Sequence, residues 1–220
     1  MPTVLTAKLD GSEAVRHVPI SLAVFHLRHA SLHAVAAARA PDGELRFKES
    51  LLTIVFASLC LEAFANEMAE DTFASDELES FFWLRGKFKT KNRSPAVAQK
   101  ICLLFERRWS VKLSAHESPL KEVAELFIVR NLLVHYRLTE SAAKAYLPTA
   151  GARTTSDGGF VMRIDLTASP MRVEPSLVET VNERRAAASY NAALRTLKLW
   201  NAHAGAPADA LSNFSECVVA

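Results

Sequence analysis

Residues 51–67 read LLTIVFASLCLEAFANE, and this stretch decides the fold. It belongs to the most apolar segment of the chain, which we expect to form a helix from Phe47 to Glu70 in the protein core. The apolar-like run ends at Glu62, well short of the roughly 18 residues that a membrane span needs. We therefore expect a core helix and no membrane partner.

Further helices are expected on both sides of this segment. Ser21 provides an N-cap for a helix that should end at Arg39, before the turn at residues 40–43. Ser94-Pro95 and Ser118-Pro119 each place a serine acceptor at a cap and a proline at the first helical position. Only 7 of 220 residues are glycine, about 3% against the usual ~7%, which also favours helices. Besides the first helix, the expected helices cover residues 75–84, 95–109 and 119–137.

The period of the pattern changes after residue 158. Apolar and polar side chains alternate over 160–166, which predicts a half-buried strand, and a short second strand is expected at 171–173. Residues 148–159 are the best linker candidate. The fold class predicted is all-α, in one domain spanning 1–220. It consists of a helical bundle with its core at about 21–137, an appended β-hairpin at about 159–174 and an appended C-terminal helix at about 175–204.

Composition favours a soluble cytoplasmic protein. The 26 basic and 24 acidic side chains give a net charge of +2, too small to indicate a nucleic-acid partner by bulk charge. Three cysteines cannot all pair within the chain, and Cys60 and Cys102 fall in apolar helical patterns, which indicates reduced, buried thiols. The first 17 residues lack the apolar core of a signal peptide.

The helix that carries the candidate chemistry contains ELFIVRNLLVHY at residues 125–136. It is apolar around nearly its whole circumference, so we expect it to be central in the bundle. Arg130, Asn131 and His135 interrupt the apolar run. A buried arginine costs several kcal/mol unless it is paired or faces a solvated cleft. These three residues are therefore the candidate site.

This segment resembles the R-x4-6-H motif of HEPN domains, with Asn131 matching the polar residue that usually follows the arginine. Residues 61–67, LEAFANE, look like a second helix motif, A-L-E-A-x-x-N-E, found upstream in many HEPN-like proteins. The resemblance covers about 47–137 and implies an HEPN-like helical bundle. It also implies a metal-independent endoribonuclease without a cofactor, acting as a toxin or antiviral defence effector. The partners implied are single-stranded RNA, a second copy in a homodimer, and an antitoxin or regulatory protein.

The residues suit that chemistry. RNA carries its own nucleophile, the 2′-hydroxyl, so an enzyme needs only a proton shuttle and an anion stabiliser. Histidine moves protons near neutral pH, and arginine offers a planar fork to phosphate. Ser58, Glu62, Asn66 and Glu70 form a polar stripe at every fourth position, from which Glu62 is expected to hold Arg130 or fix a histidine tautomer. Besides Glu62, the supporting residues are Asn66 and Tyr136.

Alternatives remain for each feature. The stripe can be a solvated face, the motif a structural polar cluster, and the protein a non-catalytic HEPN-like module that binds nucleic acid, a nucleotide or a protein. Arg28 and His33 form a second match to the motif. His26 and His29 share a helical face with His33, but no carboxylate or cysteine with ligand spacing joins them, so no metal site is expected.

A basic segment precedes the helix expected at residue 95. Basic side chains alternate around one aromatic residue, a pattern suited to tracking a phosphate backbone and stacking a base. An ordinary solvated loop is the alternative. Arg107 and Arg108 would join this end of the bundle if the turn folds back. The candidate RNA-binding residues are Arg85, Lys87, Phe88, Lys89, Lys91 and Arg93.

Overall fold

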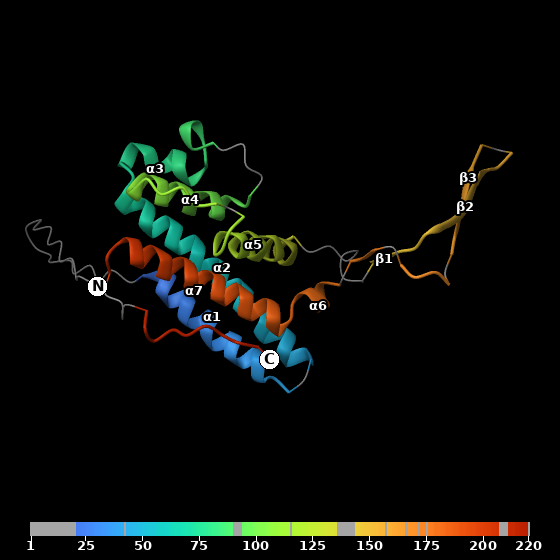
Figure 1. Cartoon of the computed structure of the whole chain (residues 1–220), viewed down its shortest axis with the longest axis horizontal. Helices are drawn as coiled ribbons and strands as arrows, with labels where there is room; N and C mark the ends of the chain where they lie inside the picture. The colour runs from blue at the N-terminus through green and yellow to red at the C-terminus, as the bar shows by residue number, and fades with distance from the viewer. Residues whose placement is uncertain are drawn as a thin grey trace, which may run out of the picture.

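The computed structural model describes residues 21–41, 43–89, 94–114, 116–135, 144–156, 158–165, 167–170, 172–174, 176–206 and 211–219. Within these ranges the chain is mostly helical and carries a small antiparallel β arm, in agreement with the predicted class. The helices pack into one body, and the β arm projects from it (Figure 1).

α2 (Gly43–Thr72) is the central helix of this body. α1 (Leu22–Arg39) and α7 (Glu183–His203) pack along it, and α4 (Ala96–Trp109) and α5 (Leu120–Val134) also contact it. By length and hydropathy α2 would be able to cross a membrane, but 44% of its most apolar window is buried inside the bundle. The arrangement is consistent with a soluble protein.

The start of α1 is fixed by two side chains. Ser21 caps the helix as the sequence predicts, its Oγ accepting the Val24 N–H at 3.2 Å. The Glu67 carboxylate of α2 accepts the Ser21 hydroxyl at 2.9 Å and the Ala23 N–H at 3.1 Å. A negative charge is favourable at a helix N-terminus. These bonds hold the α1 N-terminus against α2.

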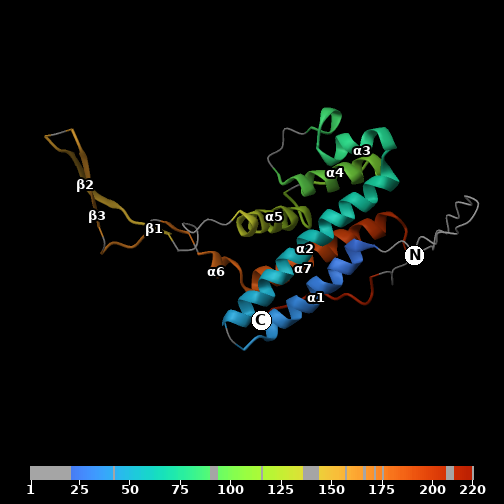
Figure 2. The same ribbon diagram turned by 180° about the vertical axis from the view of Figure 1, so that it is seen from behind.

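α3 (Ser75–Phe82), the 3-10 turn η1 (Gly86–Phe88) and α4 lie together at one end of α2 (Figures 1 and 2). α4 and α5 begin near the predicted positions, but with a different cap. Pro95 and Pro119 themselves occupy the cap positions, and neither helix has a side-chain cap hydrogen bond. The serine caps expected there were wrong.

α7 belongs to the bundle core. Its predicted start at residue 175 is replaced by a short helix α6 (Leu177–Thr180), after which Asn182 caps α7 by accepting the Arg185 N–H at 2.9 Å. Tyr190 and Leu194 are fully buried, and Trp200 packs edge-on against Phe64 of α2. The helix that looked appended in the sequence thus fills one side of the core.

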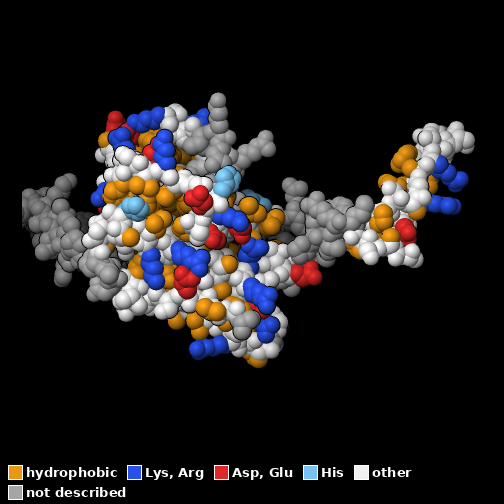
Figure 3. All heavy atoms as spheres, viewed as in Figure 1, with side chains coloured by type: hydrophobic (Ala, Val, Ile, Leu, Met, Phe, Trp, Pro, Cys, Tyr) orange, Lys and Arg blue, Asp and Glu red, His pale blue; other side chains and the backbone are white. Residues whose placement is uncertain are grey.

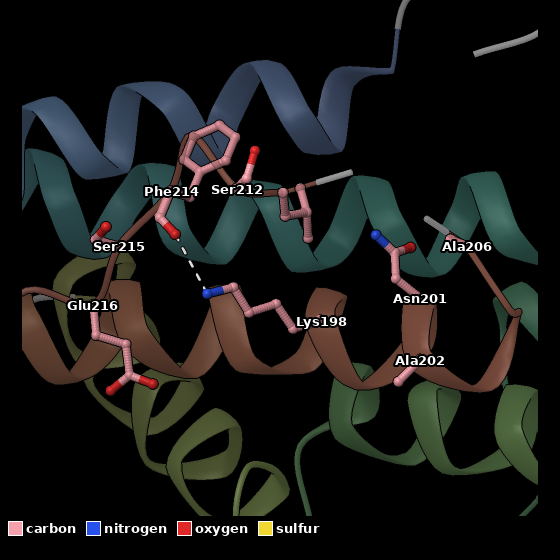
Figure 4. Close-up of a pocket in the computed structure, with 9 residues that line it drawn as sticks. Lys198, Asn201, Ala202, Ala206, Ser212, Phe214, Ser215 and Glu216 are labelled. Atoms are coloured by element: carbon pink, nitrogen blue, oxygen red, sulfur yellow. Dashed lines mark hydrogen bonds between the residues drawn. The ribbon is translucent and has the colours of Figure 1, made fainter. Parts of the chain in front are cut away.

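Residues 211–219 run back along α7. The Tyr190 hydroxyl donates to the Ser215 carbonyl at 2.9 Å, and the Asn191 amide both donates to the Cys217 carbonyl and accepts its N–H, at 2.9 and 2.8 Å. Figure 4 shows the pocket between this segment and α7, where the Lys198 ammonium donates to the Phe214 carbonyl.

The β arm differs from the predicted hairpin. β3 (Phe160–Ile164) pairs with β2 (Thr149–Thr154), which lies in the segment expected to be a linker. β4 (Arg172–Glu174) pairs instead with β1 (Lys144–Tyr146). Every residue of β2 and β3 is exposed, so the expected half-buried strand was also wrong. The alternation predicts a strand, but within the described residues no second layer covers its apolar face.

Candidate functional site

α5 carries the motif at the edge of the bundle. Its inner face is buried, but Ile128 and Leu132 are exposed on the opposite side, and Val134 is exposed in the last turn. The expectation of a central helix was therefore wrong, because the described part of the chain leaves one apolar face of α5 exposed. Hydrophobic side chains are visible at several places on the surface in Figure 3. The buried residues of α5 are Leu120, Val123, Leu126, Phe127 and Val129.

Arg130 is held between two helices. One guanidinium nitrogen lies 3.4 Å from the Glu62 carboxylate of α2, and the other donates to the Asn131 side-chain oxygen at 3.2 Å. This is the Glu62 contact that the polar stripe predicts. The side chains of Arg130 and Glu62 are 28% and 34% exposed. Such a pair contributes at most about 1 kcal/mol to stability, so it orients the guanidinium more than it holds the fold together.

His135 lies at the C-cap of α5, where its N–H donates to the Asn131 carbonyl at 2.9 Å. Its imidazole is exposed, as is the Asn131 side chain. The last two turns of the helix thus carry Arg130, Asn131 and His135 at the solvent boundary. Tyr136, the expected supporting residue, lies outside the described residues.

The rest of the polar stripe does not join this cluster. Asn66 and Glu70 are exposed, while Ser58 is buried and donates to the Val55 carbonyl at 2.8 Å. Only Glu62 therefore has the role expected of the stripe, and the solvated-face interpretation fits Asn66 and Glu70. The acidic side chain next to Asn66, Glu67, serves the α1 cap instead.

Sequence reasoning missed Lys100 of α4. Its ammonium lies 5.8 and 5.7 Å from the ring centroids of Phe81 and Phe82. Burial lowers the pKa of Lys100, and the nearby Glu62 carboxylate partly offsets that effect. The signal was available, since Lys100 interrupts the apolar run AVAQKICLLF just as Arg130 interrupts its own helix.

The basic segment is only partly available to a ligand. Lys87 and Arg107 both pair with Glu77 of α3, so the turn does fold back to bring Arg107 to this end. Lys87 and the Ala74 N–H hold the pKa of Glu77 below its usual range. Arg85 and Lys89 are exposed, whereas Lys91 and Arg93 lie outside the described residues.

Phe88 is not the aromatic residue that a base would reach. It is 6% exposed and packs edge-on against Phe73 and Phe81. The expected stacking role of Phe88 was wrong, because the 3-10 turn directs its ring into the core. Trp83, which the sequence analysis did not single out, is 66% exposed and lies beside Arg85.

The second motif match has a structural explanation. His33 is 2.6 Å from a Glu49 oxygen and stacks on Phe56, with the ring centroids 5.5 Å apart. His29 stacks on the same ring, and Arg28 is exposed. These histidines bind α1 to α2 through Phe56. In the described part of the chain, no group of three or more His, Cys, Asp or Glu side chains is placed to hold a metal ion.

The two core cysteines are poor nucleophiles. Cys60 is fully buried, and burial raises the pKa of its thiol. Cys102 is half-buried, and burial raises the pKa of its thiol as well. Both thiols therefore stay protonated near neutral pH. The reactive form of cysteine is the thiolate, which these two residues do not readily supply.

No protein-family model, curated protein or solved structure matches the chain.

Proposed function

We propose that this protein is an HEPN-type, metal-independent endoribonuclease that cleaves single-stranded RNA. One observation carries the proposal: the Arg130 guanidinium is fixed between Glu62 and Asn131 near the exposed end of α5, and His135 is the C-cap residue of the same helix. Contacts from α2 and α5 orient the Arg130 guanidinium, and the exposed His135 imidazole stands at the end of the same helix.

These residues suit cleavage by the 2′-hydroxyl of the RNA. The His135 imidazole takes the proton of that hydroxyl, whose oxygen then attacks the adjacent phosphorus. The bond from phosphorus to the 5′-oxygen breaks, leaving a 2′,3′-cyclic phosphate and a 5′-hydroxyl that needs a proton. Arg130 stabilises the negative charge that develops on the phosphate oxygens, and its fork matches them in geometry.

A homodimer would supply the second proton donor. One imidazole cannot readily serve as base and acid in the same turnover, whereas two motifs at one interface provide both groups. The exposed apolar side chains of α5 support this arrangement, because Ile128, Leu132 and Val134 lie on the helix that carries the motif. Apolar groups gathered on a surface favour association in water.

The biological setting follows from the resemblance alone. A ribonuclease of this type acts in the cytoplasm as a toxin or a defence effector and needs restraint, which an antitoxin or regulatory protein provides.

The decisive experiment incubates single-stranded RNA with the purified protein in EDTA. Wild type should cleave it, leaving cyclic phosphate ends, and Arg130→Ala and His135→Ala should each lower the rate by at least about a hundredfold. His116→Ala is the matched control, since His116 is an exposed histidine outside the site. Cleavage that survives both site substitutions would refute the assignment.

The alternative is a non-catalytic HEPN-like module that binds nucleic acid, a nucleotide or a protein. One observation favours it: both terminal nitrogens of Arg130 already contact groups of the same chain. A phosphate would have to compete with Glu62 for the guanidinium. Pure wild-type protein that binds RNA without cleaving it would establish this alternative.

A further inference from the structure

Trp83 is placed on the surface by the turn that follows α3. It is the C-cap residue of the helix, and the next residue, Leu84, adopts a left-handed conformation with φ of 48°. The turn packs Leu84 against the core and leaves Trp83 66% exposed. Tryptophan is usually well buried, and an exposed ring of this size therefore marks a contact surface.

Arg85 lies against this ring. Its guanidinium carbon is 5.7 Å from the ring centroid, a cation–π distance. With most of the indole exposed, a second flat group still has room to stack on it. An indole next to a guanidinium is the kind of surface on which nucleic-acid bases stack.

Trp83 has both signs of charge nearby in the sequence, with exposed Glu79 one helical turn before it and basic residues after it. Arg85 and Lys89 are exposed and form no ion pair with an acidic side chain in the part of the chain that the structure describes. Lys87 lies between them but is already paired with Glu77. An unpaired guanidinium against an exposed aromatic ring suits a nucleic-acid strand better than an apolar protein surface.

A row of neighbouring side chains leads from Trp83 towards the candidate active site. Phe82 precedes Trp83, and its ring lies next to the Lys100 ammonium. Lys100 is close enough to Glu62 to interact with its charge, and Glu62 pairs with Arg130. Lys100 thus connects the end of α3 to the motif.

We infer that Trp83 and Arg85 form a stacking site for an unpaired base of the RNA, and that the strand passes Lys100 to reach Arg130. The inference rests on the proposed function and specifies how the protein would recognise its RNA substrate as single-stranded. Bases in a duplex are stacked on one another and cannot reach the indole, so the site selects single-stranded RNA.

Fluorescence gives a direct test, because Trp200 is buried and Trp109 is partly covered, leaving Trp83 as the exposed tryptophan. Full-length His135→Ala protein is titrated with oligouridylate of about ten nucleotides, so that cleavage does not interfere. The oligonucleotide should quench the emission, and a duplex of equal length should not. Trp83→Phe should remove the quenching but keep the affinity, measured by anisotropy of a labelled oligonucleotide.

Three variants measure the contribution of the site. Trp83→Ala should weaken binding about 5- to 100-fold, and Arg85→Gln should reduce the slope of log Kd against log salt by about 0.7. Phe160→Ala, which removes another exposed aromatic ring on the β arm, is the control and should bind as wild type does. Unchanged affinity of Trp83→Ala, or equal quenching by duplex RNA, would overturn the inference. So would a change in oligomeric state with Trp83→Ala, since that result would make the ring a contact between copies.

The outcomes separate this inference from the proposed function. If wild type never cleaves RNA but Trp83 is quenched as described, the stacking site stands and the ribonuclease proposal fails. If wild type cleaves and Trp83→Ala leaves KM unchanged, the ribonuclease proposal stands and the stacking site fails.

Discussion

Glu62 acts through Arg130 and does not itself touch the reacting atoms in the proposed mechanism. Its carboxylate lies 3.4 Å from the guanidinium, across the contact between α2 and α5. Because both side chains are about one-third exposed, solvent screens their attraction. The value of the pair therefore lies in the direction that it gives to the arginine fork.

Substitution of Glu62 should separate orientation from stability. Glu62→Ala should lower kcat about ten- to a hundredfold, because the fork loses its anchor, with a change of less than about 1 kcal/mol in the free energy of unfolding. Glu62→Gln keeps an oxygen that accepts from Arg130 and should recover most of kcat. Single-turnover kinetics and urea unfolding measure the two effects. A large loss of stability with unchanged kcat would make Glu62 a structural residue only.

His26 should make the stability depend on pH. Burial and then the charge of His29 lower its pKa, against a smaller opposing effect of Glu67, and its Nδ1 is buried without a hydrogen-bond partner in the described structure. The folded state thus resists protonation that the unfolded chain accepts. Stability should fall as the pH drops below about 6.5, the usual histidine value, towards the lower pKa of the folded state.

Thermal unfolding between pH 7.5 and 5.5 checks this expectation. His26→Leu should reduce the fall in Tm over this range, because the protonatable group is gone from both states. His116→Leu removes an exposed histidine and serves as the control. If both variants lose the same amount of the pH dependence of Tm, burial of His26 is not the cause of that dependence.

At the scale of helices and strands, the sequence predicted correctly the features that neighbouring residues determine. Ser21 marked the start of α1 because its hydroxyl can satisfy a free N–H there. The partner of β3 was misassigned because alternation shows that a strand exists but not which other strand it pairs with. The apolar circumference of α5 likewise cannot show which face the same chain covers.

The β arm should be dispensable for the bundle. β2 and β3 are exposed throughout, and β1 and β4 form a separate pair that brings Tyr146 opposite Arg172. Replacing residues 147–171 with a short Gly-Ser turn should therefore close the chain and leave the Tm within about 2 °C. Calorimetry of the two proteins gives the answer. A fall of many degrees would mean that the arm packs on the bundle in solution.

At the scale of the whole molecule, the candidate site combines side chains from α2, α4 and α5. The Glu62 contact to Arg130 was predictable, since both residues interrupt strongly apolar helices and must find partners. Lys100 and Trp83 were missed for different reasons. Lys100 gives the same sequence signal as Arg130, whereas the exposure of Trp83 depends on the left-handed turn at Leu84, which no sequence pattern marks.

The exposed face of α5 leads to the prediction about assembly. If two copies meet there, Leu132→Glu would place an unpaired charge in the interface and weaken the dimer about a hundredfold or more. Leu32→Glu is the control, because Leu32 is also an exposed leucine but lies on α1. Sedimentation should show a monomer for the first variant and a dimer for the second, and only the first should lose RNA cleavage. Wild-type specific activity should also fall on dilution through the dimer dissociation constant, because each site needs two imidazoles. A fully active monomer would instead require one chain to supply both the base and the acid.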